Sequence, residues 1–199
     1  MEPAVWPDEA VPAWAHMRSR YYLESRGISK DESYLYDLSY CDGGLWKDRI
    51  LIPCYDEHGN LEAFQGRSLD GTEPRYRTSG PRPIYVPLRE RLSAIPLVLV
   101  EGPFDSYAVA RVTANVIATL GTQFSKEQVT EIVHLLAAYK VPSVVIMFDR
   151  DVIVEAYALQ MRLQPYIATT VIAYTFAVQE KDPGTLHAET IRTLIEANV

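Results

Sequence analysis

The second half of the chain alternates strand-length apolar runs with helix-length segments, and this alternation constrains the fold more than any other feature. The apolar runs lie at 97–100, 115–120, 144–148 and 169–176. The segments with helical periodicity lie at 104–112, 125–140, 152–163 and 185–197. Strands separated by helices of this length form βαβ units, so we predict an α/β domain built on a parallel sheet.

The first half of the chain has a different pattern. Aromatic and apolar residues recur at helical spacing within 12–30, and this helical segment ends near Gly27. Strands are predicted at 49–55 and 61–67, joined as a hairpin by a turn that contains glycine. Residues 70–83 are rich in Gly, Pro, Thr and Arg and are expected to form a surface loop. These features indicate a small mixed α/β subdomain that is partly antiparallel.

The change of pattern near residue 96 divides the chain into a basic N-terminal subdomain, residues 1–94, and an α/β domain, residues 95–199. The chain has 199 residues and is 48% hydrophobic, which supplies packed cores and argues against a disordered protein. No apolar run approaches the ~20 residues that span a bilayer, and no signal peptide is recognised, so we expect a soluble cytoplasmic protein without a membrane partner. The two cysteines form no CxxC pair, which argues against a zinc ribbon.

Five acidic residues lie at or just beyond the ends of the predicted parallel strands. Glu101 directly follows the first strand, and Asp149 and Asp151 directly follow the third. Asp182 lies in the loop after the fourth strand, and Asp105 begins the helix that follows Glu101. Ligands of open parallel sheets bind beyond the carboxyl ends of the strands. We therefore expect these acids, which are far apart in the sequence, to converge at one edge of the sheet.

Clustered carboxylates repel one another, and a hard cation relieves that repulsion. Mg²⁺ takes oxygen ligands, keeps several waters and bridges to substrate phosphates. The Asp149–Arg150–Asp151 spacing lets alternate side chains of an extended segment point the same way, which suits two ligands to one metal or one ligand to each of two. For Asp105 and Asp182 taken singly, a helix-capping role is as good an interpretation as a metal ligand, because each precedes a helix.

The charge of the chain is unevenly distributed. The net charge is −7, which is not typical of a nucleic-acid-binding protein. Residues 67–91, however, contain six arginines and only three acidic residues. A local basic strip of this kind beside an acidic metal site is able to hold a polyanion.

Three acidic motifs and an upstream basic region resemble a known family. EGPFD at 101–105, FDRD at 148–151 and KDPG at 181–184 are similar to the acidic motifs of the TOPRIM fold, which DnaG-type primases share with topoisomerases and OLD-family nucleases. The stretch from DRILIP to YVPL, with FQGR and PRY inside it, resembles the basic subdomain of bacterial and phage primases, and YYLESRGIS at 21–29 resembles a helix end in that subdomain. The resemblance spans about residues 14–197.

The resemblance implies a primase catalytic core that synthesises short RNA primers by two-metal nucleotidyl transfer. Glu101 would be the metal-proximal acid and a general acid or base, and Asp149 and Asp151 would hold Mg²⁺, for which Mn²⁺ is an alternative. Asp105 and Asp182 would complete the metal site, directly or through water. The implied catalytic residues are thus Glu101, Asp149 and Asp151.

The resemblance also implies a phosphate-binding surface, because arginine binds phosphate in a bidentate manner and stays charged. The residues assigned to template or nucleotide binding are Arg49, Arg67, Arg75, Arg77, Arg82 and Lys181. The expected partners are a single-stranded DNA template, ribonucleoside triphosphates, and a replicative helicase or a separate zinc-binding module. No zinc-binding or helicase-binding region is recognised in the chain, which indicates an excised catalytic core or a compact phage or plasmid primase.

The chain departs from the family pattern at several positions. Arg75 stands where the family has lysine, and Thr78 and Ser79 stand where it has Asn–Ser. Arg150 separates Asp149 from Asp151, and we interpret it as a bystander rather than a phosphate contact. Two alternatives stay open. A TOPRIM nuclease would nick DNA without nucleotides, and a non-catalytic module would bind DNA independently of the acids.

Overall fold

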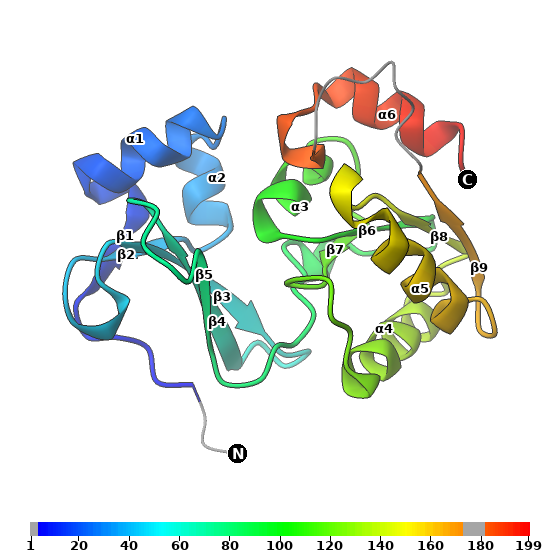
Figure 1. The fold of residues 1–199 in the computed structure, drawn as a ribbon, viewed down its shortest axis with the longest axis horizontal. Helices are drawn as coiled ribbons and strands as arrows, with labels where there is room; N and C mark the ends of the chain where they lie inside the picture. The colour runs from blue at the N-terminus through cyan, green and yellow to red at the C-terminus, as the bar shows by residue number, and fades with distance from the viewer. Residues whose placement is uncertain (1–3, 173–181) are drawn as a thin grey trace. The chain divides into compact units, whose positions relative to one another are not determined.

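The computed structural model describes residues 4–172 and 182–199, and the chain forms two compact units, Met1–Pro83 and Ile84–Val199 (Figure 1). The second unit begins earlier than the boundary after residue 94 that the sequence pattern indicated. Ile84 and Leu92 belong to the core of this unit, and Tyr85 pairs with Ala118 beside the sheet. Residues 84–94 therefore belong to the second unit.

The first unit contains a five-stranded antiparallel sheet. Its strands, in spatial order, are β1 (Ala10–Pro12), β2 (Ser39–Cys41), β3 (Arg49–Tyr55), β4 (Leu61–Ser68) and β5 (Tyr76–Ser79). The predicted hairpin is confirmed as β3 and β4, and Asp56 accepts hydrogen bonds from the backbone N–H groups of His58 and Asn60 in the turn. The prediction of a loop over 70–83 is wrong in part, because 76–79 pairs with β4 as an edge strand.

Two short helices, α1 (Met17–Ser25) and α2 (Lys30–Leu35), accompany this sheet. The helical segment predicted over 12–30 begins with a 3-10 turn, η1 (Ala13–Ala15), and is interrupted by Gly27, whose φ of 67° is the left-handed conformation that commonly ends a helix. Ser29 then starts α2 with a capping box to Glu32. A second 3-10 turn, η2 (Gly44–Trp46), precedes β3.

The second unit contains the predicted parallel sheet. Its strands are β6 (Leu97–Val100), β7 (Val116–Ala118), β8 (Ser143–Ile146) and β9 (Ala168–Val171), in the order β7-β6-β8-β9. The part of the predicted fourth strand beyond residue 172 lies outside the described residues. The chain runs outward in one direction from β6 to β7 and in the other from β8 to β9, so the gap between β6 and β8 is the topological switch point, where α/β sheets bind ligands.

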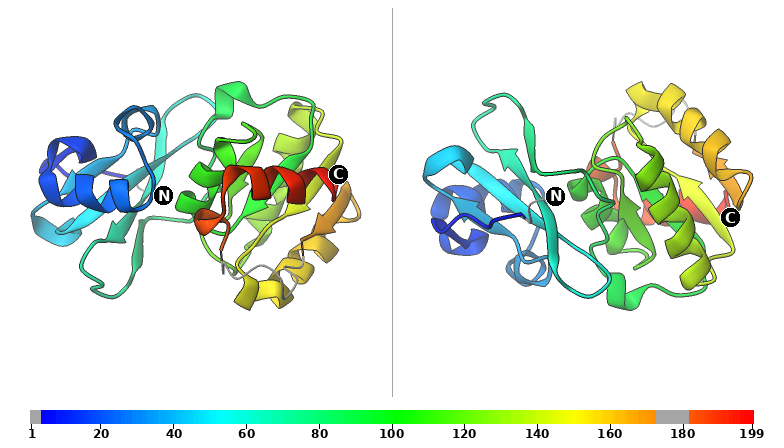
Figure 2. Two further views of the ribbon diagram at one scale, coloured as in Figure 1. Left: turned by 90° about the horizontal axis from the view of Figure 1, so that it is seen from above. Right: turned by 90° about the horizontal axis from the view of Figure 1, so that it is seen from below.

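Helices cover both faces of the parallel sheet. Those of the second unit are α3 (Pro103–Ala110), α4 (Lys126–Ala138), α5 (Ile153–Leu163) and α6 (Ala188–Glu196). This unit also contains the 3-10 turns η3 (Arg89–Arg91), η4 (Arg150–Val152) and η5 (Pro183–Thr185). Helix α3 contacts α6 on one face and α4 contacts α5 on the other, as Figure 2 shows from two sides. Ser125 and Gln128 form the predicted capping box of α4. Within residues 4–172 and 182–199, no helix is both long enough and apolar enough to span a membrane.

Candidate functional site

The carboxyl ends of β6 and β8 place two acids at the switch point of the parallel sheet. Glu101 directly follows β6, and Asp149 lies three residues beyond the end of β8. Both side chains are half-buried. Backbone hydrogen bonds hold the connections here, since Met147 N–H donates to Leu99 O at 2.8 Å and Gly121 N–H donates to Glu101 O at 3.2 Å. The two acids therefore stand on a rigid edge of the sheet.

Asp105 joins the site from the first turn of α3. Its Oδ2 accepts a hydrogen bond from the backbone N–H of Gly102 at 3.1 Å, which satisfies one free donor at the start of the helix. Its Oδ1 accepts a hydrogen bond from the backbone N–H of Gly184 at 3.1 Å, although Gly184 is 79 positions away in the sequence. Asp105 thus links the start of α3 to the turn η5.

Asp182 reaches the same place from the start of η5. A Cβ added at Gly184 would lie 2.9 Å from Oδ1 of Asp105 and 3.1 Å from Oδ1 of Asp182. Both carboxylates therefore face the small space over Gly184. The Asp182 backbone carbonyl accepts hydrogen bonds from the N–H of Thr185 at 3.2 Å and from its hydroxyl at 2.9 Å, which fix the turn.

Burial and mutual repulsion raise the pKa of two of these carboxyl groups. Burial is the largest cause for Asp105, whose pKa rises from 3.8 to about 7, and the charges of Asp182 and Glu101 add to the increase. Burial also raises the pKa of Asp149 to about 8, and the other acids add to the increase, Asp105 most and Asp151 least. Glu101, Asp105, Asp149 and Asp182 act on one another through these charges and form what we call the acidic cluster.

Asp151 lies in a turn and not in the extended segment on which its predicted direction was based. Arg150–Val152 forms the 3-10 turn η4, which follows Asp149 at φ −56° and ψ 147°. Alternation of side chains does not apply to a turn, so that reason for Asp149 and Asp151 to point the same way does not hold, and the metal-binding role of Asp151 stays a prediction. Asp151 is exposed at the edge of the acidic cluster.

The donor atoms of the acidic cluster fit a hard divalent cation. Oδ1 of Asp149 and Oδ1 of Asp182 are buried, and neither has a hydrogen-bond partner among the described residues. Over 4–172 and 182–199, no group of three or more His, Cys, Asp or Glu side chains is arranged to hold a metal ion by itself. Mg²⁺ usually binds one or two carboxylates and completes its shell with waters and substrate phosphates, so an open set of carboxylates suits it.

Arg49 and Arg77 share one face of the antiparallel sheet. Arg77 lies opposite Gly66, and Gly66 lies opposite Leu51, two residues beyond Arg49. Alternate residues of a strand project to the same face, and so do residues that lie opposite each other on paired strands. The side chains of Arg49 and Arg77 therefore lie on one face of the sheet. Arg49 is 4% exposed and donates to Gly66 O at 3.1 Å, while Arg77 donates to Leu45 O at 2.9 Å. Burial, followed by repulsion from Arg77, lowers the pKa of Arg49.

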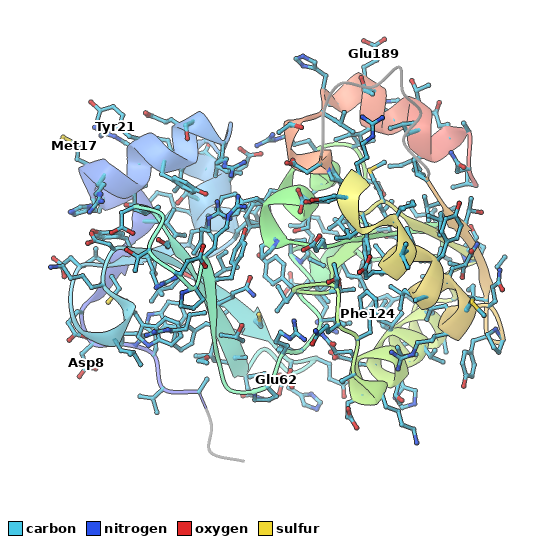
Figure 3. The ribbon with its side chains drawn as sticks, in the orientation of Figure 1. Asp8, Met17, Tyr21, Glu62, Phe124 and Glu189 are labelled. Atoms are coloured by element: carbon cyan, nitrogen blue, oxygen red, sulfur yellow. The ribbon has the colours of Figure 1, made fainter. Side chains whose placement is uncertain are left out.

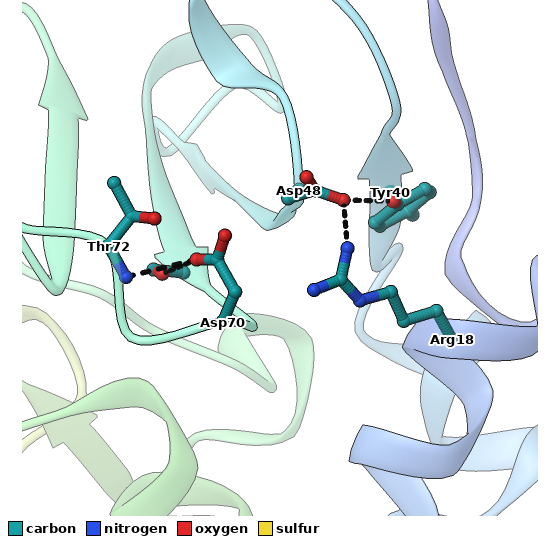
Figure 4. A network of polar contacts seen from close by, with 6 residues as sticks. Arg18, Tyr40, Asp48, Asp70 and Thr72 are labelled. Atoms are coloured by element: carbon teal, nitrogen blue, oxygen red, sulfur yellow. Dashed lines mark hydrogen bonds and ion pairs between the residues drawn. The ribbon is translucent and has the colours of Figure 1, made fainter.

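Asp48 supports Arg49 from the preceding position, and the sequence argument did not identify it. Its Oδ1 accepts hydrogen bonds from Arg18 of α1 at 2.5 Å and from the hydroxyl of Tyr40 at 2.8 Å (Figure 4). Its φ of 58° is unusual for a residue other than glycine. Asp48 therefore fixes the point at which the chain enters β3. An acid directly before Arg49 was the one available signal in the sequence.

Asp70 organises the loop on the other side of Arg49. Its Oδ1 accepts hydrogen bonds from the hydroxyl of Ser68 at 2.9 Å and from the backbone N–H of Thr72 at 3.0 Å, the second group drawn in Figure 4. Hydrogen bonds from Thr72, and then from Ser68, lower the pKa of Asp70 well below its usual range. The carbonyl of Thr72 in turn accepts a hydrogen bond from Arg49 at 3.4 Å.

Arg67 lies on the opposite face of the sheet. It is paired with Ile50 on one side and Tyr76 on the other, one position out of register with Gly66 and therefore facing away from Arg49. Its guanidinium lies 4.7 Å from the ring centre of Tyr76 and 5.8 Å from that of Tyr22. Arg67 is 6% exposed, and its Nε has no hydrogen-bond partner among the described residues. The expected basic strip is therefore divided between two faces.

Three further basic residues were assigned to the predicted phosphate-binding surface. Arg75 and Arg82 are both exposed. Arg75 directly precedes β5, and Arg82 follows it. Lys181 lies outside the described residues. The roles of these three residues in template or nucleotide binding stay predictions.

Gly66→Ala is expected to destabilise the first unit by about 1–3 kcal/mol, because it overfills a packed site. The new Cβ would lie 2.8 Å from Trp46 and 3.1 Å from Cδ of Arg49, so both side chains would have to move. Urea unfolding measures the change. Gly43→Ala is the matched control, since its Cβ would meet only Glu9, at 3.5 Å. Equal unfolding midpoints for the two variants would contradict this packing.

Comparison with known proteins finds a family match within the second unit and sequence relatives of the chain. Residues 96–177 match the Toprim domain family. The chain is 32% identical over 118 residues to DNA primase of Pseudomonas putida, and 31% identical over 137 residues to DNA primase of Staphylococcus aureus. These alignments cover 53% and 62% of this chain, but only 17% and 21% of the relatives. The chain thus spans about one fifth of the length of the curated relatives that it matches.

The fold extends the likeness to nearly the whole chain. The DnaG primase catalytic domain solved with single-stranded DNA matches with a TM-score of 0.78 at 19% sequence identity, covering 94% of this chain and 74% of that one. The match includes strands of both compact units, since it covers more of the chain than either unit alone. Residues 96–177 thus match the Toprim domain family, and the chain has the fold of the DnaG primase catalytic domain.

Proposed function

We propose that this chain is the catalytic core of a DNA primase that synthesises short RNA primers on single-stranded DNA. The observation that carries the proposal is the acidic cluster at the switch point of a Toprim sheet, in a chain similar in sequence to DNA primases. The proposed partners are a single-stranded template and ribonucleoside triphosphates, with a helicase or a zinc-binding module on another chain or segment.

The acidic cluster supplies the metal ligands in this proposal. Glu101, Asp149 and Asp182 would hold divalent cations, and the exposed Asp151 would contribute from the solvent side. When bound there, Mg²⁺ supplies positive charge that activates the attacking 3′-hydroxyl and neutralises the pyrophosphate leaving group. Glu101 is half-buried at the end of β6 and would accept the proton of that hydroxyl.

The antiparallel sheet supplies the phosphate contacts. Arg77 is half-buried and shares its face with Arg49, whose guanidinium is held by backbone carbonyls. A guanidinium fixed in this way loses little further entropy when it binds a phosphate. Arg67, stacked on Tyr76, would contact template or nucleotide from the opposite face. Arg75, Arg82 and Lys181 would extend the contacts along the polyanion.

Primer synthesis by the purified chain tests the proposal. Labelled ribonucleotides, a single-stranded DNA template and Mg²⁺ or Mn²⁺ should give short RNA products, and omission of the template or the metal should abolish them. Metal-dependent nicking of DNA in the absence of nucleotides would instead identify a nuclease. DNA binding without synthesis, unaffected by removal of the acids, would identify a non-catalytic module.

A further inference from the structure

Both carboxylate oxygens of Asp105 are occupied by backbone donors. Oδ2 accepts the N–H of Gly102 and Oδ1 accepts the N–H of Gly184, each at 3.1 Å. In contrast, Asp149 and Asp182 each keep a buried oxygen that has no hydrogen-bond partner among the described residues. Of these three aspartates, Asp105 is thus engaged with the backbone, while Asp149 and Asp182 each have an oxygen available to a cation.

The Gly184 contact joins two elements that the sequence separates widely. Helix α3 packs against η5, and the hydrogen bond from Gly184 to Asp105 lies between them. Asp182 begins η5, and its backbone carbonyl is bonded to Thr185 within the same turn. Because the turn is held internally, fixing Gly184 also fixes the backbone of Asp182, from which its carboxylate projects.

Glycine at position 184 is what permits so close an approach. A Cβ there would lie 2.9 Å from Oδ1 of Asp105 and 3.1 Å from Oδ1 of Asp182. Carbon atoms do not approach oxygen so closely without displacement, and the obstacle includes a carboxylate that is itself hydrogen-bonded. The φ of Gly184 is not in the positive range, so alanine would suit the backbone and only the lack of space excludes it.

We propose that Asp105 is a positioning residue, which holds Asp182 in the metal site through the N–H of Gly184, and is not itself a metal ligand. We call the contact between Asp105 and Gly184 the lock. Gly184 supplies both its N–H donor and the space into which the carboxylates of Asp105 and Asp182 project. The inference rests on the proposed metal site and deepens it. It separates Asp149 and Asp182, each with a buried oxygen that has no hydrogen-bond partner among the described residues, from Asp105, whose two oxygens both accept backbone N–H groups.

Two measurements on metal-free and Mn²⁺-titrated protein test the lock without any activity assay. Hydrogen exchange at the amide of residue 184, followed by NMR, should be at least about tenfold faster in Asp105→Ala, because a hydrogen bond to a charged acceptor is lost. The Mn²⁺ dissociation constant, measured by electron paramagnetic resonance, should rise about tenfold in the same variant.

The conservative variant separates positioning from ligation. Asp105→Asn keeps one oxygen that accepts the Gly184 N–H but turns its NH2 group toward the N–H of Gly102, so its exchange rate and its Mn²⁺ dissociation constant should lie between those of the wild type and of Asp105→Ala. A carboxylate that ligates metal directly would lose its affinity in both variants, because an amide oxygen carries no charge. Equal loss of Mn²⁺ affinity in Asp105→Asn and Asp105→Ala would overturn the proposal.

Gly184→Ala disturbs the same contact at its other residue and keeps every acidic residue in the sequence. It should weaken Mn²⁺ binding about tenfold by pushing Asp105 and Asp182 apart. The matched controls are Gly43→Ala, whose Cβ has room, and Glu189→Gln, whose side chain projects outward from α6 (Figure 3). Unchanged Mn²⁺ affinity in Gly184→Ala would also overturn the proposal. Neither measurement depends on primer synthesis, so a failure of the proposed function is recognised separately.

Discussion

Asp149→Asn should reduce primer synthesis by on the order of a thousandfold, equivalent to about 4 kcal/mol of transition-state stabilisation. Asp149 stands at the switch point of the sheet, and its buried Oδ1 has no partner within the described chain. The amide keeps the volume of the side chain but removes the charge that a divalent cation needs. The measurement is the rate of ribonucleotide incorporation on a single-stranded template at saturating Mg²⁺.

Asp151→Asn provides the comparison within the same turn. Because Asp151 is exposed and contributes least to the raised pKa of Asp149, its loss should reduce synthesis by only about tenfold. Glu189→Gln, which removes an exposed charge from α6, should leave synthesis unchanged. If Asp149→Asn kept more than a tenth of the wild-type rate, the assignment of Asp149 as a metal ligand would be wrong.

In the absence of metal, the protein should lose stability as the pH rises from about 5 to about 8.5. The pKa of Asp105 is about 7 and that of Asp149 about 8 in the folded chain, against 3.8 ordinarily. The folded state therefore holds protons that the unfolded state has already released, and stability falls as the pH passes through the folded pKa values. Both carboxyl groups are partly exposed, and solvent screens their charges, so the loss of stability is smaller than the pKa values alone imply. We expect the melting temperature to fall by about 5 °C.

Calorimetry in EDTA and in Mg²⁺ separates this effect from general alkaline destabilisation. Mg²⁺ should raise the melting temperature more at pH 8.5 than at pH 5.5, since it binds the deprotonated carboxylates. Asp149→Asn should flatten the pH dependence of the metal-free protein, because it removes the group with the larger shift. A metal-free melting temperature that rises between pH 5 and pH 8.5 would contradict the electrostatics of the acidic cluster.

The parallel sheet and its acids could be predicted because they depend on local patterns. Runs such as 97–100 are buried on both faces of a sheet and read as continuous apolar strands. A parallel sheet gathers the carboxyl ends of its strands at one edge, so Glu101 and Asp149 had to lie near each other once the strands were known. The order of the three acidic motifs along the chain then supported their resemblance to the TOPRIM fold.

The features that the sequence argument missed depend on non-local geometry. The faces of Arg49 and Arg67 follow from the pairing register of β3, β4 and β5, which a single sequence does not specify. Strand β5 is short and half-buried, and it lies within a stretch rich in Gly and Pro that is typical of a loop. The turn at Asp151 lies in the connection 147–152 between β8 and α5, and no turn residue such as Gly or Pro marks it in the sequence.

Crystals grown with Mn²⁺ and a ribonucleoside triphosphate would show whether the acidic cluster binds metal, because manganese is located by its anomalous scattering. We expect a manganese ion within about 2.5 Å of carboxylate oxygens of both Glu101 and Asp149, at the switch point between β6 and β8. A fully occupied manganese ion bound to the triphosphate but with no contact to either residue would contradict this expectation.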